Sequence, residues 1–162
     1  MIKLVSVDNE EKTLEIIDMI NQYDSLRSEF GDKIDRLACS EYSFLIKKNE
    51  DTVGFANLVY EKEDYRFLFL DIGIKDEYQG KGIAKEVQKQ IEKFEVPQYI
   101  IIETSINNHK AINSLKSRIR IKVIEDRVFY LLQRKRYEEF IVFNGVDNLI
   151  DHYNKLDEKK IK

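Results

Sequence analysis

The stretch YQGKGIAKEV (residues 78–87) places two of the chain's six glycines, Gly80 and Gly82, at the start of a predicted helix. It follows YRFLFLDIGI (residues 65–74), whose length and apolar middle predict a central β-strand. The helix is predicted over residues 80–94, because apolar residues recur there at helical spacing, namely Ile83, Val87, Ile91 and Phe94. Glycine weakens a helix, so two glycines at its start require another reason.

A glycine-rich helix start suits an anion. Its first turn leaves about four backbone N–H groups unpaired at the positive end of the helix dipole. Glycine has no Cβ to keep a phosphate or pyrophosphate away from those groups. Lys81 adds a positive charge between the two glycines. The alternative interpretation is that the glycines only permit a tight turn.

Known phosphate-binding patterns differ in how well they fit this turn. The P-loop is absent, because it needs four residues between its glycines and a Gly-Lys-Ser/Thr ending. The dinucleotide pattern GxGxxG fits Gly80 and Gly82, and Glu103 lies near the expected position of its acidic residue. However, Lys85 takes the place of the third glycine, and residues 75–79 separate the turn from the strand. A nucleotide-binding domain of Rossmann type is therefore the weakest hypothesis.

A further pattern, Gln/Arg-x-x-Gly-x-Gly/Ala, matches QGKGIA (residues 79–84) throughout. In its context, DIGIKDEYQGKGIA (residues 71–84) resembles the strand-to-helix segment of the GNAT superfamily of acetyl-CoA-dependent N-acetyltransferases. NHKAINSL (residues 108–115) is similar to the later Asn-x-x-Ala helix of that family. Similarity at the level of motifs covers about residues 52–117, and the order of predicted elements extends it to about residue 132.

The resemblance implies acetyl-CoA as the cosubstrate and assigns residues to it. The pyrophosphate is expected on the backbone N–H groups of Gln79, Gly80, Lys81, Gly82, Ile83 and Ala84. In the family the central strand separates from its neighbour and pairs with the pantetheine arm, a position that Ile72 and Ile74 occupy. Their side chains can belong to the core at the same time. Asn108 matches a position that contacts the cofactor arm, with a helix cap as the equally weighted alternative.

The implied reaction is direct attack of a primary amine, from a small molecule or a peptide, on the thioester. A base must take a proton from the amine, because a protonated amine is no nucleophile. Glu103, at the end of the strand after the glycine helix, lies where some family members place that base. Asp71 on the central strand is the second candidate. For either carboxylate, the alternative is a strand residue that merely faces solvent.

One position departs from the family pattern. Many members carry a tyrosine late in the second motif, which protonates the departing thiolate, and this chain has Leu115 there. Ser114, Tyr130 or water are the candidate substitutes, since a thiolate is a tolerable leaving group near neutral pH. The alternative function is therefore a non-catalytic module on the same fold that binds acyl-CoA or a partner.

The chain's 162 residues and their pattern predict a single α+β domain. Hairpins are predicted at residues 42–62 and 119–132, on either side of one strand–helix–strand unit at residues 65–104. This order predicts a mixed, mostly antiparallel sheet flanked by helices, which is the GNAT fold. The domain is predicted over residues 1–135, and residues 136–162 as a helical extension that packs on the domain or forms a homodimer contact.

The N-terminal part predicts a strand in MIKLVSV followed by two helices. Asp8 is the expected cap of the first helix, whose apolar spacing is Leu14, Ile17 and Ile20. The second helix is expected over about residues 24–37, with Gly31 as its weak point.

Composition excludes several classes of function. A net charge of -3, from 27 basic and 30 acidic residues, gives no attraction to nucleic acid. No apolar run reaches the roughly 20 residues of a membrane helix, and the start of the chain lacks the apolar core of a signal peptide. The single cysteine, Cys39, fits a cytoplasmic setting. His109 and His152 have no partner spacing for a metal, so no metal site is expected.

Overall fold

A computed structural model describes residues 1–38, 40–61 and 64–144 of the chain, and in them a mixed seven-stranded sheet forms the centre of the fold. The strands are β1 (Ile2–Ser6), β2 (Tyr42–Lys48), β3 (Asp51–Glu61), β4 (Asp64–Ile74), β5 (Tyr99–Ser105), β6 (Ile119–Ile124) and β7 (Arg127–Leu131). Their order across the sheet is β1-β2-β3-β4-β5-β7-β6, and every neighbouring pair is antiparallel except β4 and β5. The predicted mixed, mostly antiparallel sheet is confirmed.

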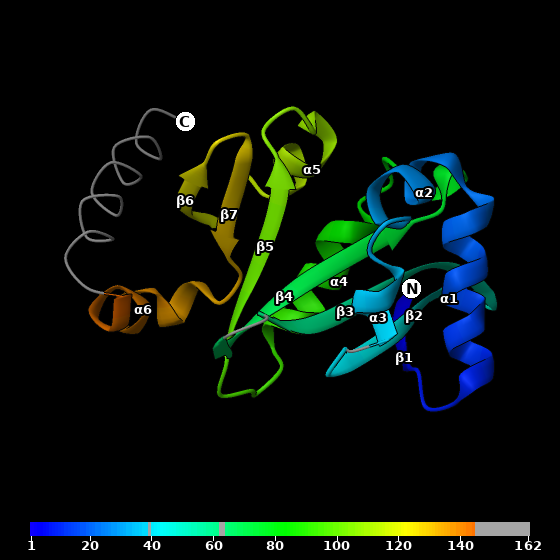
Figure 1. Ribbon diagram of the computed structural model, residues 1–162, viewed down its shortest axis with the longest axis horizontal. Helices are drawn as coiled ribbons and strands as arrows, with labels where there is room; N and C mark the ends of the chain where they lie inside the picture. Colours follow the sequence, from blue (N-terminus) through cyan, green and yellow to red (C-terminus); the bar gives the residue numbers. More distant parts are fainter. Residues whose placement is uncertain (39, 62–63, 145–162) are drawn as a thin grey trace.

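Helices lie on both faces of the sheet (Figure 1). They are α1 (Glu10–Gln22), α2 (Asp24–Phe30), α3 (Ile34–Ala38), α4 (Ile83–Glu92), α5 (His109–Ser114) and α6 (Tyr137–Asn144), with short 3-10 turns at Asp76–Tyr78 and Arg134–Arg136. The helix expected over residues 24–37 is two helices, because the chain leaves α2 at Gly31. The helix expected from residue 80 begins at Ile83, because both glycines have positive φ and lie outside it.

Two details of the first helix differ from the prediction. Asn9, not Asp8, caps α1, because its side-chain oxygen accepts from the Lys12 backbone N–H at 2.9 Å. The buried face is Ile16, Met19 and Ile20, whereas Leu14 is 51% exposed. The apolar spacing therefore predicts the helix correctly, but Leu14 does not belong to its buried face.

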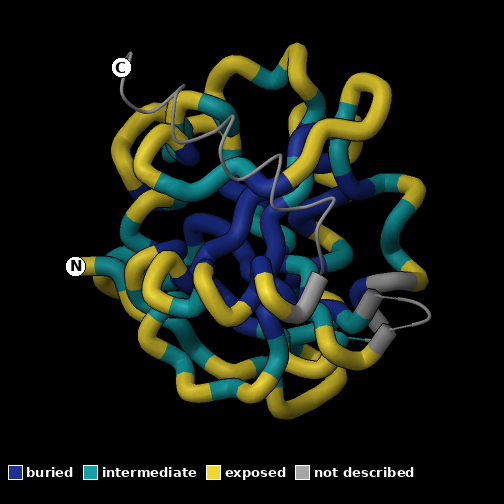
Figure 2. Tube along the Cα trace, turned by 90° about the vertical axis from the view of Figure 1, so that its left-hand side faces the viewer, coloured by how far each residue is buried: buried dark blue, intermediate teal, exposed yellow. Residues whose placement is uncertain are grey.

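Three apolar clusters form the core, one on the α4 side of the sheet and two on the opposite face. On the first side, Ile83, Val87 and Ile91 of α4 pack against strand side chains such as Leu68 and Ile100. On the opposite face, α1, α2 and α3 cover the β2–β3 half through Ile16, Met19, Ile20, Leu26, Phe30, Leu37, Leu45 and Phe55. α6 covers the β5–β7–β6 half of that face through Tyr99, Ile101, Ile121, Leu131, Tyr137, Phe140 and Ile141. Figure 2 shows these buried residues running through the middle of the molecule.

The sheet opens between its two parallel strands. β4 and β5 pair only through Phe67 with Tyr99, Leu68 with Ile100 and Phe69 with Ile101. Beyond these rungs the two strands diverge, β4 toward α2 and β5 toward α5, as Figure 1 shows. The residues of β4 and β5 beyond the last rung therefore border an opening in the sheet. We refer to this opening as the β4–β5 gap.

Arg136 fixes the start of α6 to the rest of the domain. Its guanidinium donates to the carbonyl oxygens of Gln98 at 2.7 Å and Pro97 at 3.0 Å, and to Glu139 Oε1 at 3.0 Å. It also lies over the Tyr99 ring, 4.2 Å from the centroid. The remainder of the predicted extension, residues 145–162, lies outside the described residues, so its packing or dimer contact stays a prediction.

Replacing Arg136 by methionine should lower the free energy of unfolding by about 2 kcal/mol, because carbonyl oxygens and a carboxylate lose their donor. Urea unfolding measures this change, and Arg134→Met is the control, since Arg134 is exposed and makes one 3.3 Å bond to Ser117 O. The Glu139 carboxyl provides a second measurement. Hydrogen bonds from Arg136 and Tyr99 lower its pKa, so NMR titration should find this pKa raised in Arg136→Met. Equal stability of the two variants would contradict the assigned role of Arg136.

Candidate functional site

The glycine-rich turn has the backbone geometry that an anion site requires. Gly80 and Gly82 have φ of +76° and +78°, a left-handed conformation that side chains with a Cβ rarely adopt. A Cβ placed on either glycine would meet nothing within 4 Å. The space next to the turn is thus open, and both glycines are exposed.

Backbone donors at the start of α4 point out of this turn. The helix begins at Ile83, and the bond from Glu86 N to Gly82 O at 3.1 Å closes its first turn. The N–H groups of Ile83 and Ala84 precede that bond and have no intrahelical acceptor. No side chain of the described residues caps this helix start. The Gln79 N–H differs, because it already donates to Asp76 O at 3.3 Å.

Packing and charge complete the anion site. The Ile83 side chain is 4% exposed and anchors the helix start in the core. Lys81 is exposed, with its Nζ 5.5 Å from the centroid of the Tyr78 ring. The turn therefore offers free N–H groups, an approach without Cβ atoms and one cation, which fits a pyrophosphate.

A polar network ties the turn to the junction of α1 and α2. Gln79 Nε2 donates to Ile74 O at 3.1 Å and to Ser25 Oγ at 3.0 Å, and Ser25 Oγ bonds to Asp76. Tyr23 OH donates to Glu77 Oε1 at 3.0 Å, and desolvation together with this carboxylate raises the Tyr23 pKa. Sequence reasoning did not find this network, because Ser25 and Gln79 are brought together only by the fold.

Gln79→Leu should weaken acetyl-CoA binding about 3- to 10-fold, because the loss of two hydrogen bonds loosens the turn that presents the donors. Gln90→Leu in α4 is a matched control, since it removes a side-chain amide hydrogen bond, from Gln90 Nε2 to Ile2 O at 2.9 Å, away from the turn. Isothermal titration with acetyl-CoA measures the dissociation constants of both variants. Equal affinities for the two variants would show that the Gln79 side chain does not support the site.

The backbone of β4 presents Ile72 and Ile74 to the β4–β5 gap. Lys75 N donates to Val53 O on β3 at 2.9 Å, and backbone groups of alternate residues point to opposite edges of a strand. The N–H and C=O groups of Ile72 and Ile74 therefore point away from β3, toward the side where β5 has left. The bond from Gln79 Nε2 to Ile74 O agrees with this direction. An extended ligand arm in the gap could pair with the Ile72 backbone as an added strand does.

Four polar side chains form a row across the face of the sheet that carries α1, α2 and α3. The register pairs Ser43 with Asn57, and Asn57 with Asp71. Because Phe69 pairs with Ile101, Asp71 and Glu103 are each two residues beyond the last rung and face the same side. We call Ser43, Asn57, Asp71 and Glu103 the polar row. It crosses the β4–β5 gap between Asp71 and Glu103, so both catalytic candidates border the gap on one face.

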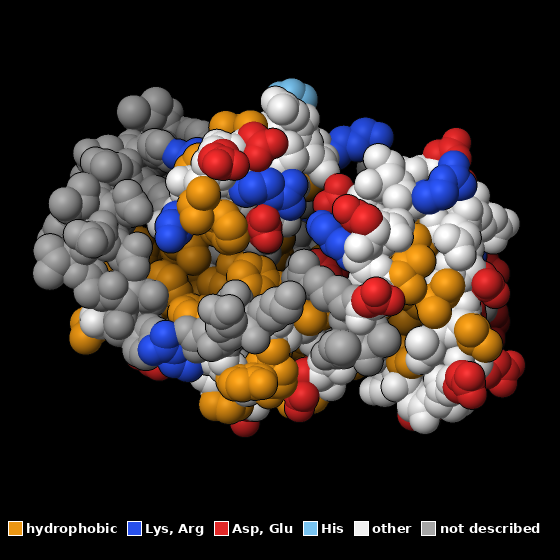
Figure 3. Space-filling model, in the orientation of Figure 1, with side chains coloured by type: hydrophobic (Ala, Val, Ile, Leu, Met, Phe, Trp, Pro, Cys, Tyr) orange, Lys and Arg blue, Asp and Glu red, His pale blue; other side chains and the backbone are white. Residues whose placement is uncertain are grey.

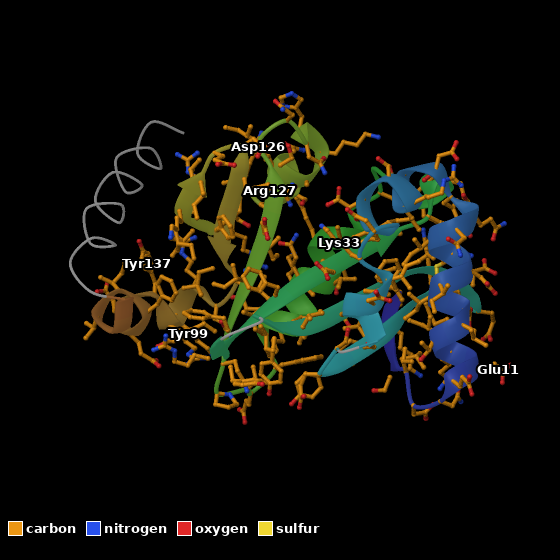
Figure 4. The ribbon with its side chains drawn as sticks, viewed as in Figure 1. Glu11, Lys33, Tyr99, Asp126, Arg127 and Tyr137 are labelled. Atoms are coloured by element: carbon orange, nitrogen blue, oxygen red, sulfur yellow. The ribbon has the colours of Figure 1, made fainter. Side chains whose placement is uncertain are left out.

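Arg127 on β7 holds the Glu103 carboxylate. Its Nε donates to Glu103 Oε1 at 2.9 Å, and both side chains are about one third exposed, at 31% and 29%. Figure 4 shows Arg127 beside the end of β5, and Figure 3 shows acidic and basic side chains close together at the centre of this face. The ion pair links Glu103 on β5 to β7, the neighbouring strand on the side away from β4. Arg127 gave no signal in the sequence, because its partner lies 24 residues away.

The residues of the NHKAINSL motif (108–115) have structural roles in this fold. Asn108 caps α5, with its Oδ1 accepting from Ala111 N at 3.1 Å, while its contact with a cofactor stays a prediction. Leu115 is 1% exposed and packs in the core with α4. Ser114 Oγ donates to Ala111 O at 2.7 Å, and Tyr130 is 7% exposed. The position of the usual tyrosine acid is therefore core in this chain.

Comparisons with known proteins agree with this fold. The sequence model of the acetyltransferase (GNAT) family matches residues 8–117. A search of curated proteins found no match. Solved structures are similar in fold, among them the spermidine/spermine N-acetyltransferase SpeG from Vibrio cholerae, at 16% identity and a TM-score of 0.58, over 86% of this chain and 98% of that one. The N-acetyltransferase PseH from Campylobacter jejuni, in complex with acetyl coenzyme A, has 17% identity and a TM-score of 0.57, over 83% of this chain and 99% of that one.

The chain therefore belongs to the GNAT acetyltransferase family, and the predicted family is confirmed. This membership assigns it acyl-CoA-dependent N-acetyl transfer as its class of activity. In the fold, the glycine-rich turn follows the end of β4, and the β4–β5 gap opens at the same end of that strand. Within the described residues, no helix is long and apolar enough to cross a membrane.

Proposed function

We propose that the protein transfers the acetyl group of acetyl-CoA to a primary amine of a small molecule or peptide. The main support for this proposal is the β4–β5 gap. On one side of the gap the β4 backbone has no β5 partner, and two carboxylates, Asp71 and Glu103, lie at its border. Acetyl-CoA would be held by the backbone N–H groups at Gly80 to Ala84, by Lys81, and by the Ile72 backbone. When bound, it supplies the thioester that the amine attacks.

Glu103 is the proposed base. The Glu103 carboxylate takes a proton from the ammonium form of the acceptor, directly or through a water molecule, and the amine nitrogen then attacks the thioester carbon. A C–N bond forms, the nitrogen loses its second proton to water, the C–S bond breaks, and the sulfur leaves as a thiolate. Arg127 keeps Glu103 oriented by binding one oxygen and leaves the other for the proton. Asp71 attracts the cationic acceptor and is the alternative base.

The thiolate is proposed to leave without a tyrosine from the second motif. Leu115 occupies that position and is buried in the core, so no acid can act from there. A thiol has a pKa of about 8.5, so the thiolate can depart and take its proton from water. Catalysis therefore depends on the base and on orientation of the amine, rather than on an acid for the leaving group.

Thermal shift and thiol release together test this function. Acetyl-CoA at about 100 times its dissociation constant should stabilise the fold by about 2.7 kcal/mol, and NAD should not. A panel of primary amines should then release CoA thiol from acetyl-CoA. Stabilisation by acetyl-CoA without release by any amine would instead support the non-catalytic acyl-CoA-binding module. Stabilisation by NAD alone would contradict both functions.

The acceptor class is proposed from charge. The carboxylate oxygens of Asp71 and Glu103 can accept hydrogen bonds from an amine that arrives as a cation. The fold also resembles that of the Vibrio cholerae spermidine N-acetyltransferase, whose structure was solved in complex with CoA and spermine. A homodimer contact through residues 136–162 also stays a proposal. Light scattering of the purified chain tests it, with a monomer mass as the contradicting result.

A further inference from the structure

Asn57 is a buried amide with nothing to bind in the described structure. It lies in the middle of β3, has 0% exposure, and neither Oδ1 nor Nδ2 has a hydrogen-bond partner among the described residues. Gln133, another buried amide, shows the usual situation, because its Oε1 accepts from Ile100 N at 2.7 Å and its Nε2 donates to Gln98 O at 3.1 Å. A buried amide without partners destabilises the fold, so Asn57 requires a reason outside the stability of the core.

The place of Asn57 supplies that reason. It belongs to the polar row, directly across from Asp71, on the face opposite α4. Directly opposed strand residues have Cβ atoms about 5 Å apart, so one small ligand fragment can reach both side chains. Asn57 is fully buried on β3, on which α3 packs, whereas Asp71 and Glu103 are partly exposed at the gap. The row is thus open at its carboxylates and closed at Asn57.

We propose that Asn57 binds the acceptor substrate, and that this acceptor carries a hydroxyl or carbonyl oxygen next to its amino group. The proposal rests on the proposed function and deepens it. The amino group lies at Asp71 and Glu103, beside the thioester in the gap, and the neighbouring oxygen lies further along the row. Asn57 Nδ2 donates to that oxygen, and Oδ1 accepts from a hydroxyl or an N–H of the acceptor.

This arrangement selects among amines. A plain aliphatic diamine has only donors near its reacting nitrogen, so Asn57 Nδ2 would stay unpaired when the diamine binds. An amino alcohol, an amino sugar or an amino acid amide gives both atoms of the Asn57 amide a partner. Sites built to bind a substrate polar group reject analogues that lack it, because the buried group of the protein is then left unpaired.

Steady-state kinetics with four probe amines test the proposal: 1,4-diaminobutane, 2-aminoethanol, D-glucosamine and glycinamide. The wild-type chain should prefer the three oxygen-bearing amines. Asn57→Leu should lower kcat/KM for those three amines about tenfold or more, mainly because KM rises. The kcat/KM for 1,4-diaminobutane should change little. Asn57→Asp keeps an acceptor for a hydroxyl or N–H of the substrate and loses the donor to its oxygen, so kcat/KM should fall for all three oxygen-bearing amines, glycinamide included. The dissociation constant for acetyl-CoA should stay at the wild-type value in both variants.

Folding is controlled in the same experiment. Asn57→Leu places an apolar side chain between Phe55 and Val59 on the same face, so its Tm should equal or exceed that of the wild type. Gln133→Leu is the matched control, because it removes a buried amide whose two partners remain; its Tm should fall and its preference among amines should not change.

The outcomes separate the inference from the function on which it rests. If the wild-type chain acetylates amines and Asn57→Leu keeps the same KM for all four, the inference is wrong and the proposed function stands. A wild-type preference for 1,4-diaminobutane would overturn the inference in the same way. If the wild-type chain acetylates no amine, both fail together.

Discussion

Gly82→Val should raise the dissociation constant for acetyl-CoA by about 100-fold or more while the chain still folds. Gly82 has a φ of +78°, and an L-residue in that conformation costs about 1–2 kcal/mol. No atom of the protein lies within 4 Å of the added Cβ, so the fold itself has room for it. In the proposed site, the space it enters is where the pyrophosphate approaches the N–H groups of Ile83 and Ala84. Losing two hydrogen bonds to a charged group, at about 1.5–3 kcal/mol each, accounts for the expected change in affinity.

Isothermal titration measures the dissociation constant for acetyl-CoA, and circular dichroism measures whether Gly82→Val folds. Lys89→Val is the control, because Lys89 is an exposed position of α4 away from the turn, and the substitution adds a β-branched residue to the same helix. Lys89→Val should bind acetyl-CoA as the wild type does. Binding of acetyl-CoA by folded Gly82→Val with wild-type affinity would exclude the turn as the pyrophosphate site.

Glu103→Gln should lower kcat by about 10²- to 10⁴-fold, which is the usual contribution of a general base. Glutamine keeps the shape of the side chain and an oxygen that accepts from Arg127 Nε, so the local structure should persist. The amide cannot take a proton from the acceptor amine. The ion pair is partly exposed, so its loss should change the free energy of unfolding by less than about 1 kcal/mol. The dissociation constant for acetyl-CoA should remain at the wild-type value.

Asp71→Asn distinguishes the two candidate bases. With Glu103 as the base, Asp71→Asn should raise KM for a cationic amine more than it lowers kcat. Glu125→Gln, an exposed position in the turn between β6 and β7, is the control for the loss of one negative charge. A large fall in kcat for Asp71→Asn, together with normal turnover by Glu103→Gln, would assign the base to Asp71 instead.

Much of the fold follows from local patterns in the sequence. The alternation of β2 and β3, the long apolar β4 and the helical spacing of α4 each arise from neighbouring residues, and the predicted order of elements agrees with the structure. The errors lie at boundaries. Gly31 ends α2, Asn9 replaces Asp8 as a cap, and Leu14 lies outside the buried face, because small differences in capping and packing decide such positions.

The candidate site was predictable only in part. The sequence singles out Asp71 and Glu103, because each lies toward the end of a buried strand next to the glycine unit, and their catalytic roles stay predictions. Asn57 was missed, although an amide in the otherwise apolar part of TVGFANLVYEK is a signal that polar chemistry is buried there. Leu115 was identified as a departure from the family pattern, and the structure gives its physical meaning, since its side chain is core.

The sequence by itself determined the glycine-rich turn and the family. Both depend on residues within one short segment, where Gly80 and Gly82 permit positive φ and Ile83 starts a helix. Only the tertiary structure decided that Ser43, Asn57, Asp71 and Glu103 lie in one row, and that Arg127 holds Glu103. Strand register and the divergence of β4 from β5 set these relations. They arise from pairing between segments far apart in the chain, which local sequence preferences do not encode.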